Sequence, residues 1–551
     1  MRATLVAWVS IGLMAIGLAH STAYAQVPRE LILPPLPTPP PPELERLPRE
    51  RVLVREVRVV GSTVFSVDEL AKVTAPYLNR ELTAENLEAL RVALTLLYVN
   101  AGYVNSGAIL PDQRVVDGVI TYQVIEGAVT AIEVGGNRWF RSSYLQKRLA
   151  LGTGPPVNAS VLQQQIQLLL EDPRIRRLHV ELLPGLNPGD AVLRASVEDR
   201  PPFRASIDFN NHLSPSVGAE QGILTLEDVN LTGNGDILTL RYGGSEGAFP
   251  LYDFKYSLPF TARDTTLSLR YRKNTFAVLE EPFQELDIES ESEIYTIAVR
   301  QPIFRTLNSE VAIELIGEHL SHETFLLGER FTLVPGARNG RSVVTALRAQ
   351  LEWVYRTPDQ VIALRSRFSA GLNILGATIN PKGEPDGKFF AWLGQAQLVR
   401  RLPFLDAQLI LRSDLQLADD LLLSLEQVAV GGRYSVRGYR ENTLVRDNAF
   451  LASLEVRVPL VRNTPWADFL ELAPFADYGR GWRTRSPSPD AEVISSAGIG
   501  LRWAVTIAAG PISLRPQLEV YWGHPWRERK TEGNDLQDKG LHLQFVLSAF
   551  F

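Results

Sequence analysis

Several residue types and patterns are absent from this sequence, and each absence excludes a class of protein. There is no cysteine among the 551 residues, so disulfides, zinc–thiolate sites and cysteine nucleophiles are excluded. After residue 25 no run of about 18 apolar residues occurs, so no transmembrane helix is expected there. The net charge of -6 lacks the basic excess that nucleic-acid binding requires. We therefore expect no nucleic-acid partner, and stability that comes from burial and hydrogen bonds.

The first 50 residues have the character of a targeting segment followed by a spacer. Arg2 precedes an apolar run over 4–19, and Ala-Tyr-Ala at 23–25 fits a small-residue cleavage site, so we predict that 1–25 is a secretory signal peptide. A membrane anchor is the alternative, but the run is short and the cleavage motif follows it directly. Residues 26–50 are rich in proline and are expected to form an extended linker, with a proline-rich partner ligand as the competing interpretation.

An internal repeat follows the linker. VRVVGSTVFSVDEL at 57–70 and IEVGGNRWFRSSYL at 132–145 share glycine, aromatic and leucine positions in register. Within the first copy, strand-like alternation is followed by helical spacing over 66–77 and 83–101, where Thr83 is a candidate N-cap, and then by two further alternating runs. The order β-α-α-β-β recurs in the second copy. We predict two α+β modules, at 51–127 and 128–200.

The remainder, residues 201–551, has the texture of membrane-spanning β-strands. Apolar Ala452, Leu454 and Val456 alternate with Ser453 and Glu455, and the same two-faced pattern recurs in other segments. A soluble sandwich would bury the apolar face and needs few arginines, whereas a transmembrane barrel turns it to lipid and its charged face to a wet lumen. We count about 16 segments, roughly 22 residues apart, as expected for spanning strands and their loops. The fold class predicted is an all-β transmembrane barrel of about 16 antiparallel strands.

The carboxyl terminus adds a more specific sign. KGLHLQFVLSAFF places apolar side chains on one face of a strand and ends on an aromatic residue. Such a terminal strand resembles the signal that outer-membrane barrels present to the barrel assembly machinery. The residues that would form this insertion signal are Gly540, Leu541, Leu543, Phe545, Leu547, Ala549 and Phe551.

Four motifs, in order, resemble one protein family. They are LPDQRVVDGVITYQVIEG at 110–127, NLTGNGD at 230–236, VRGY at 436–439 and FADYG at 475–479. The first resembles the end of a POTRA domain, and the other three resemble barrel motifs of the BamA/TpsB superfamily. Two modules, rather than more, favour the TpsB branch of two-partner secretion transporters, the FhaC/ShlB/HecB-like haemolysin secretion/activation proteins.

The resemblance implies a location and an activity. The barrel would lie among the lipid and lipopolysaccharide of the bacterial outer membrane, with both POTRA domains in the periplasm and loops near 320–340 and 380–388 outside. The POTRA domains would capture an unfolded exoprotein of the TpsA type, which would leave through the barrel. A BamA-like barrel insertase and, less favoured, a passive porin remain as alternatives. A barrel-plugging helix, common in the family, is doubtful here because prolines interrupt residues 26–48.

The resemblance also assigns the site residues. A long loop would fold into the lumen and place its arginine against an acid on the barrel wall. The loop motif consists of Val436, Arg437, Gly438 and Tyr439, and the partner motif of Phe475, Asp477 and Gly479. An arginine fork is best matched by a carboxylate, which it can grip with two parallel hydrogen bonds.

Three other motif matches are interpreted as structural. GGSEG around Ser245 formally matches a nucleophile elbow, but a strand-like segment follows where a helix is required. His319 and His322 would face opposite sides of a strand, which does not suit a metal pair. The carboxylates of DIESESEIY at 287–295 are interpreted as a solvated loop rim. We therefore expect no catalysis, no metal and no cofactor.

Overall fold

The computed structural model describes residues 51–281, 283–485, 492–527 and 534–551. The predicted signal peptide and linker lie outside these residues. The described chain forms two compact units, one ending at Arg200 and one beginning at Pro201. Within the described ranges, no helix combines the length and the apolar character needed to cross a membrane.

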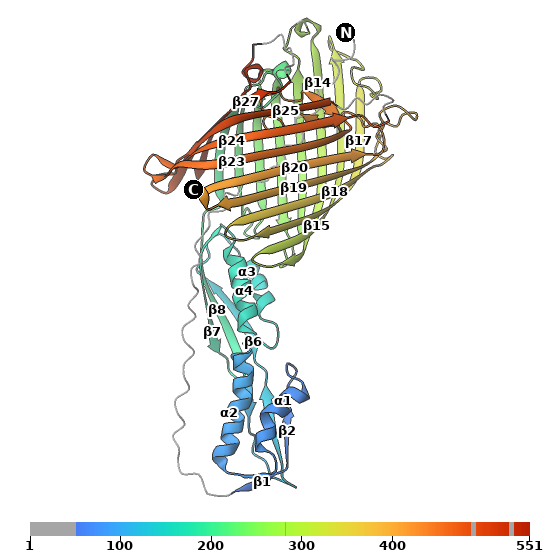
Figure 1. Cartoon of the computed structure of the whole chain (residues 1–551). Helices are drawn as coiled ribbons and strands as arrows, with labels where there is room; N and C mark the ends of the chain where they lie inside the picture. The colour runs from blue at the N-terminus through green and yellow to red at the C-terminus, as the bar shows by residue number, and fades with distance from the viewer. Residues whose placement is uncertain (1–50, 282, 486–491, 528–533) are drawn as a thin grey trace. The chain divides into compact units, whose positions relative to one another are not determined.

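The first module of the N-terminal unit packs two helices on a small sheet (Figure 1). Strand β5 is central, with β2 parallel on one side and β4 antiparallel on the other, and β1 and β3 form a separate pair. The sequence reading missed that pair because each strand is too short to show alternation. The elements are β1 (Val52–Val54), β2 (Glu56–Val60), α1 (Val67–Thr74), β3 (Arg80–Leu82), α2 (Ala84–Asn100), β4 (Gly107–Ile109) and β5 (Val119–Ile125).

The second module has the order β-α-α-β-β that the sequence predicts. Its sheet runs β6-β8-β7, with β6 parallel to the central β8. The longer helix of each module begins at a polar cap: Thr83 Oγ1 accepts from the Asn86 backbone N–H at the start of α2, and Asn158 Oδ1 accepts from the Ser160 backbone N–H at the start of α4. The elements are β6 (Ala128–Gly135), α3 (Ser142–Leu149), α4 (Ala159–Leu170), β7 (Ile175–Pro184) and β8 (Asp190–Asp199).

The repeated glycine has a steric cause. A Cβ on Gly61 would lie 2.5 Å from the carbonyl oxygen of Val124, and a Cβ on Gly136 would lie 2.8 Å from that of Val197. In both modules, therefore, the strand before the first helix, β2 or β6, turns away at a point where only glycine fits against the last strand, β5 or β8. The carboxylate two residues beyond that contact then holds the turn.

In the first module that carboxylate is Glu126, which accepts hydrogen bonds from the backbone N–H groups of Thr63 (2.7 Å) and Val64 (3.0 Å) and from the Tyr98 hydroxyl (2.9 Å). Burial opposes ionisation, but these hydrogen bonds win and lower the pKa of Glu126. Asp199 holds the corresponding turn of the second module by accepting a hydrogen bond from the Trp139 backbone N–H at 2.7 Å. Sequence alignment of the repeat did not single out these acids.

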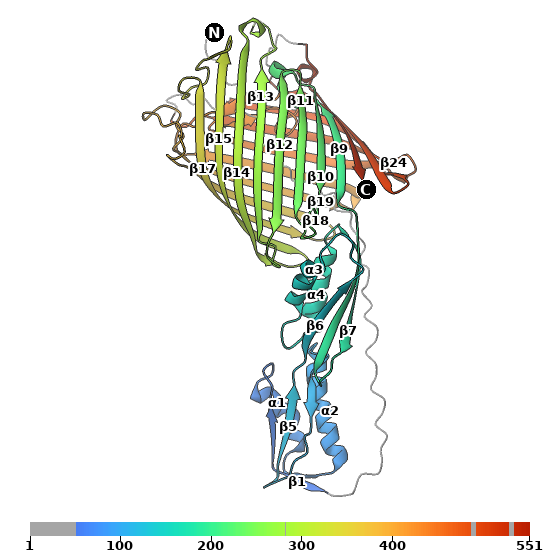
Figure 2. The same ribbon diagram turned by 180° about the vertical axis from the view of Figure 1, so that it is seen from behind.

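The second unit is a closed antiparallel barrel of 16 long strands, as predicted. Figure 1 shows the wall formed by β18, β19, β20, β23 and β24, and Figure 2 the wall formed by β9 to β14. Strand β28 pairs with β9 and closes the cylinder. The long strands are β9 (Phe203–Asn210), β10 (Gln221–Asp228), β11 (Ile237–Ser245), β12 (Ala248–Pro259), β13 (Thr266–Ala277), β14 (Ile288–Arg305), β15 (Ser309–Leu326), β17 (Arg341–Arg356), β18 (Gln360–Gly371), β19 (Phe390–Leu402), β20 (Ala407–Ala418), β23 (Asn448–Thr464), β24 (Ala467–Trp482), β25 (Glu492–Ala504), β27 (Ile512–Pro525) and β28 (Leu541–Phe550), with short β16 (Glu329–Arg330) and β26 (Ile507–Ala509) between them.

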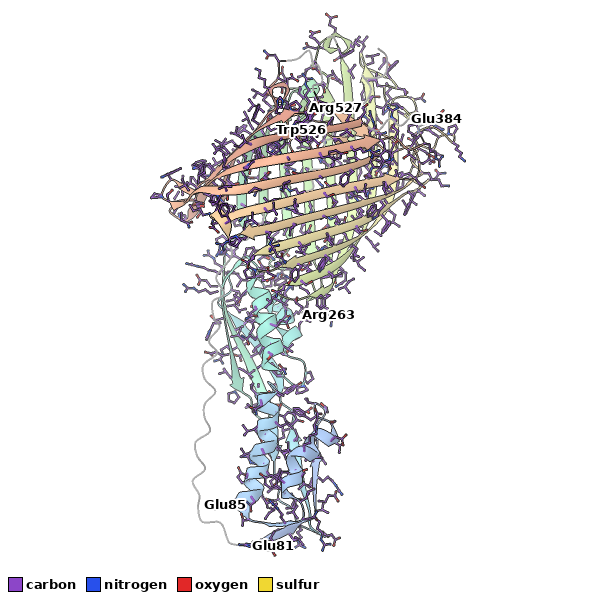
Figure 3. All side chains as sticks on the ribbon, viewed as in Figure 1. Glu81, Glu85, Arg263, Glu384, Trp526 and Arg527 are labelled. Carbon is purple, nitrogen blue, oxygen red and sulfur yellow. The ribbon has the colours of Figure 1, made fainter. Side chains whose placement is uncertain are left out.

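The connections alternate between the two ends of the barrel because successive strands are antiparallel. The chain enters at Phe203, so the connection containing Arg263 lies at the entry end and the connection containing Glu384 at the opposite end (Figure 3). With the POTRA domains in the periplasm, the connections 327–340 and 372–389 face outside. Residues 320–326, predicted to belong to the first of these loops, continue β15 instead.

This topology leads to a prediction for intact cells. Leu327 and Leu375, one in each of these connections, are 67% and 71% exposed. We expect a protease added to intact cells to cut within 327–340 and 372–389 and to spare 51–200, as identified by the masses of the fragments. A cut within 51–200 before the outer membrane is permeabilised would contradict this orientation.

Candidate functional site

The candidate site is a long connection that returns to the inner wall of the barrel. Residues 419–447 join β20 to β23, the eleventh and twelfth long strands. Within this loop, β21 (Val428–Val430) pairs with β22 (Leu444–Arg446), so the loop is a hairpin with its tip at 431–443. The VRGY motif lies in this tip.

The structure places Arg437 against Asp477, the pair that the resemblance implies. Arg437 Nε donates to Asp477 Oδ2 at 2.7 Å and Nη2 donates to Oδ1 at 2.8 Å, which is the two-pronged arrangement of a guanidinium on a carboxylate. The backbone N–H of Arg437 also donates to Oδ2, at 3.0 Å. Both residues are 3% exposed. One carboxylate on β24 thus fixes both the side chain and the backbone of the loop tip.

Strand β23 supplies the remaining partners of the guanidinium. Arg437 Nη1 forms an ion pair with Glu455, and Nη2 donates to Ser453 Oγ at 3.1 Å. The Ser453 hydroxyl in turn donates to Asp477 Oδ1 at 2.7 Å. The Arg437 Cζ atom lies 3.6 Å from the centre of the Phe475 ring, within cation–π range. The partner motif therefore contributes its aromatic face as well as its acid.

These contacts keep the arginine charged. Burial alone would lower the pKa of Arg437, but hydrogen bonding to Asp477 and the charges of Asp477 and Glu455 raise it above its ordinary value. A buried pair of this kind is weak support for overall stability, but breaking it leaves an unpaired charge and is costly. The arrangement can therefore hold the tip in one position as long as both partners are present.

Gly438 allows the tip to cross two further strands of the wall. Its φ is +89°, and a Cβ there would lie 2.7 Å from the carbonyl carbon of Gly523 on β27. Gly540, predicted as part of the insertion signal, fills the same crossing: its Cβ would lie 2.1 Å from the Gly523 oxygen. The Gly438 N–H donates to Nε2 of His542 on β28, at 3.3 Å. Three backbone segments meet here at a distance that only glycine permits.

The other motif residues pack around this crossing. The Tyr439 hydroxyl lies within hydrogen-bond distance of the backbone oxygens of Ser495 (3.1 Å) and Arg527 (3.2 Å), to either of which it can donate, so it contacts the barrel wall beside the tip. Val436 is fully buried, and a Cβ on Gly479 would lie 2.8 Å from its methyl group. Gly479 is therefore the position where β24 leaves room for the loop.

A second charged cluster adjoins the first, and the sequence reading did not connect it with the loop. Arg433 Nη2 donates to Glu519 Oε2 at 2.7 Å, and Arg502 Nε donates to Glu519 Oε1 at 3.0 Å. Arg502 also donates to Glu471, at 2.8 Å. The alternation of β23 and β27 already placed Glu455 and Glu519 on the charged face, but the pattern within one strand cannot indicate which charges meet the loop.

The three motifs interpreted from the sequence as structural lie in or at the ends of barrel strands. Ser245 ends β11 and donates to the Val217 carbonyl at 2.7 Å. His322 is buried against Ser292, whereas His319 contacts Thr345, and the described residues contain no cluster of three potential metal ligands. The prediction for 287–295 was wrong in its structure: Ile288 to Tyr295 belong to β14, because the strand keeps its alternation beyond the apolar region.

The remaining motifs lie at strand ends. In the turn 230–236, Asn230 Oδ1 accepts from the Gly235 N–H at 2.7 Å, and Asp236 accepts from the Thr232 N–H at 3.0 Å. The predicted terminal residues form β28, which follows Gly540 and alternates as expected. Leu541, Leu543, Phe545, Leu547 and Ala549 share its outward face, and Phe551 follows it with 45% exposure.

Comparison with known proteins agrees with this architecture. The outer membrane transporter CdiB of Dickeya dadantii is 26% identical over 406 residues, covering 70% of this chain and 69% of the relative. The structure of CdiB from Escherichia coli matches with a TM-score of 0.66 at 21% identity, covering 94% of both chains. BamA of Haemophilus ducreyi lacking POTRA domains 1–3 matches with a TM-score of 0.53 at 14% identity, covering 90% of this chain and 100% of that one, which shows the shared fold.

The family assignment rests on two matched regions. Residues 52–127 match the ShlB-type POTRA domain, and residues 189–503 match the haemolysin secretion/activation protein family. The second region covers more than half of the chain and includes the loop motif and its partner motif on the barrel wall. The chain therefore belongs to the haemolysin secretion/activation protein family ShlB/FhaC/HecB.

Proposed function

We propose that this outer-membrane transporter exports one exoprotein partner in extended form, and that the loop tip on Asp477 controls the passage. The observation that carries the proposal is the buried contact of Arg437 with Asp477 and Glu455, which holds a long loop against the inner wall. The polar and charged inner faces of the strands suit an unfolded polypeptide, because water and side chains can satisfy its backbone groups. Folding of the exoprotein outside the cell would supply direction without a nucleotide.

Capture begins, in this proposal, at the free edge of the first POTRA sheet. The edge at β4 is occupied: the Ala108 N–H donates to Thr95 Oγ1 at 3.1 Å, and Arg91 Nη1 donates to the Ala108 oxygen at 3.3 Å. The opposite edge is β2, where Val60 is 41% exposed. An extended segment of the exoprotein can add to β2 as a further strand.

Biogenesis involves two further partners. We propose that the barrel assembly machinery reads β28, whose outward apolar side chains and terminal Phe551 are exposed in the described structure. The same outward face, continued around the barrel, contacts the lipid and lipopolysaccharide of the outer membrane.

Deletion of residues 51–127 tests the capture step. We expect secretion of the exoprotein to be abolished, because the proposed receptor edge at β2 is gone, while the barrel and β28 remain complete. Secretion is measured by the exoprotein in the culture medium, and barrel assembly by heat-dependent mobility on a gel. Normal secretion by an assembled deletion variant would show that the first POTRA domain is not the receptor.

The alternative function is barrel assembly, and it makes a different prediction about partners. The likeness to BamA supports a common fold, whereas two modules and the family assignment favour secretion. Residues 51–200 form one compact part of the chain and should retain a single large secreted protein from periplasmic extract. Recovery of several outer-membrane barrel proteins instead would favour the insertase function.

A further inference from the structure

The lumen loop is attached to the barrel wall at a second place. Its base, residues 419–427, contacts Arg348, which lies far from the VRGY motif in the sequence. Arg348, which points inward from β17, donates from Nη2 to Glu426 Oε1 at 2.7 Å and from Nη1 to Glu426 Oε2 at 3.0 Å. Its Nε donates to Glu318 Oε2 on β15, at 2.9 Å. The side chains of Arg348 and Glu426 are 4% and 5% exposed. A buried, two-pronged ion pair therefore holds the base to β17, whereas the tip is held to β24.

An apolar cluster includes neighbours of this ion pair in the sequence: Ala346 lies two residues before Arg348 on β17, and Leu425 precedes Glu426. The inward faces of β14, β15 and β17 are otherwise polar near this level, with Ser292, His322 and Ser342 among their buried residues. Apolar side chains that face a wet lumen are unfavourable unless they are covered, and the loop base covers them. Leu422, Leu423 and Leu425 pack against Ile294, Leu320, Val344, Ala346, Phe389 and Ala391.

Asp447 fastens the two limbs of the loop to each other. Its Oδ1 accepts from the Leu422 N–H at 3.1 Å and from Gln427 Nε2 at 2.9 Å, and its Oδ2 accepts from the Thr484 N–H at 3.0 Å. The β21–β22 ladder continues this joint toward the tip. The base and the hairpin therefore form one body. It is attached to the inner wall at β14, β15 and β17 and, through Thr484, at the end of β24.

The tip is joined to that body at a pair of glycines and is held differently. Gly431 and Gly432 follow β21 directly and have φ values of +115° and +99°. Beyond them, the tip contacts the wall through ion pairs and hydrogen bonds, such as those of Arg433 and Arg437, and through Val436 and Tyr439, which pack in a smaller apolar cluster with Ala449 and Ile494. Water in an opening lumen can replace polar contacts, whereas it cannot replace the leucine contacts of the base.

We infer that the loop works in two parts: residues 419–430 and 444–447 stay fixed to the wall as a mount, and only the tip, 431–443, leaves its seat when the pore opens. Glu426, Arg348 and Asp447 are then positioning residues that aim the tip at Asp477. This inference deepens the proposed function and rests on it.

Because the chain contains no cysteine, engineered pairs can lock each part separately. For the mount we choose Arg446→Cys with Gly481→Cys, since a Cβ on Gly481 would lie 3.3 Å from the Arg446 Cβ, near the about 3.5–4.5 Å of a disulfide. For the tip we choose His212→Cys with Tyr434→Cys, whose rings have centroids 5.4 Å apart, joined by a short bis-methanethiosulfonate reagent. Both bridges are cleaved by reductant.

The measurement is the ion conductance of the purified full chain in planar bilayers, before and after reductant. We expect the bridged mount to open as the unmodified chain does, and the bridged tip to lose its large openings until reductant restores them. Loss of openings in the bridged mount, or their persistence in the bridged tip, would overturn the inference. An unmodified chain that never conducts would overturn the proposed pore itself, and the inference with it.

Discussion

Arg437→Ala and Asp477→Ala should each abolish most secretion while the barrel still assembles. Arg437→Ala leaves the Asp477 carboxylate buried without its arginine, and Asp477→Ala leaves Arg437 with Glu455 as its remaining acid. Breaking a buried pair in this way costs about 3–5 kcal/mol. A cost at the lower end reduces the fraction of chains with a seated tip about a hundredfold. Arg437→Lys keeps the charge but cannot make the two parallel hydrogen bonds to Asp477, so we expect it to retain an intermediate level of secretion.

The double variant and a matched control identify the cause. If Arg437 and Asp477 act only through each other, the double alanine variant should secrete no less than either single variant. Arg480→Ala is the control, because Arg480 lies on the same strand as Asp477 but is exposed on the outer face. Losses that add in the double variant, or wild-type secretion by Arg437→Ala, would show that this pair does not hold the loop. Exoprotein in the medium and heat-dependent gel mobility are measured for every variant.

The sequence predicts the barrel well because its strands carry their own signal. A residue at every second position must face lipid, so the alternation around Leu454 is visible without any tertiary information. The same rule explains two errors. Alternation is not visible in the three-residue strands β1 and β3. Residues 287–295 were predicted to form a loop because they are polar, whereas their alternation continues β14 beyond the apolar region.

The interior of the barrel could not be predicted in the same way. The contact between Arg437 and Asp477 was predicted only from the family resemblance. The two residues are 40 positions apart in the sequence, and the alternation within a strand carries no information about which loop residue it contacts. The contact of Arg348 with Glu426 spans 78 residues and belongs to none of the recognised motifs, so the mount was missed entirely. Alternation tells which residues face the lumen, but the partners within it depend on how the loop folds across the wall.

Gly438→Ala should impair secretion about as severely as Arg437→Ala, although it changes no charge. The added Cβ would lie 2.7 Å from both the carbonyl carbon and the carbonyl oxygen of Gly523. These atoms belong to the backbone of β27, which is hydrogen-bonded on both sides and cannot yield. The tip must therefore rise from the wall, and the hydrogen bond from the Gly438 N–H to His542 and the seating of Arg437 are lost together. Exoprotein in the medium is the measurement.

A glycine elsewhere in the chain separates this clash from backbone strain. Gly328 has a φ of +77°, close to the +89° of Gly438, but a Cβ there would meet no atom within 4 Å. Gly328→Ala therefore carries the same left-handed penalty of about 1–2 kcal/mol without a collision, and we expect it to secrete normally. Equal secretion by the two alanine variants would contradict the tight crossing at Gly523. A loss confined to Gly438→Ala would show that the tip must lie against β27, since both substitutions carry the backbone penalty but only the methyl group at residue 438 meets another backbone.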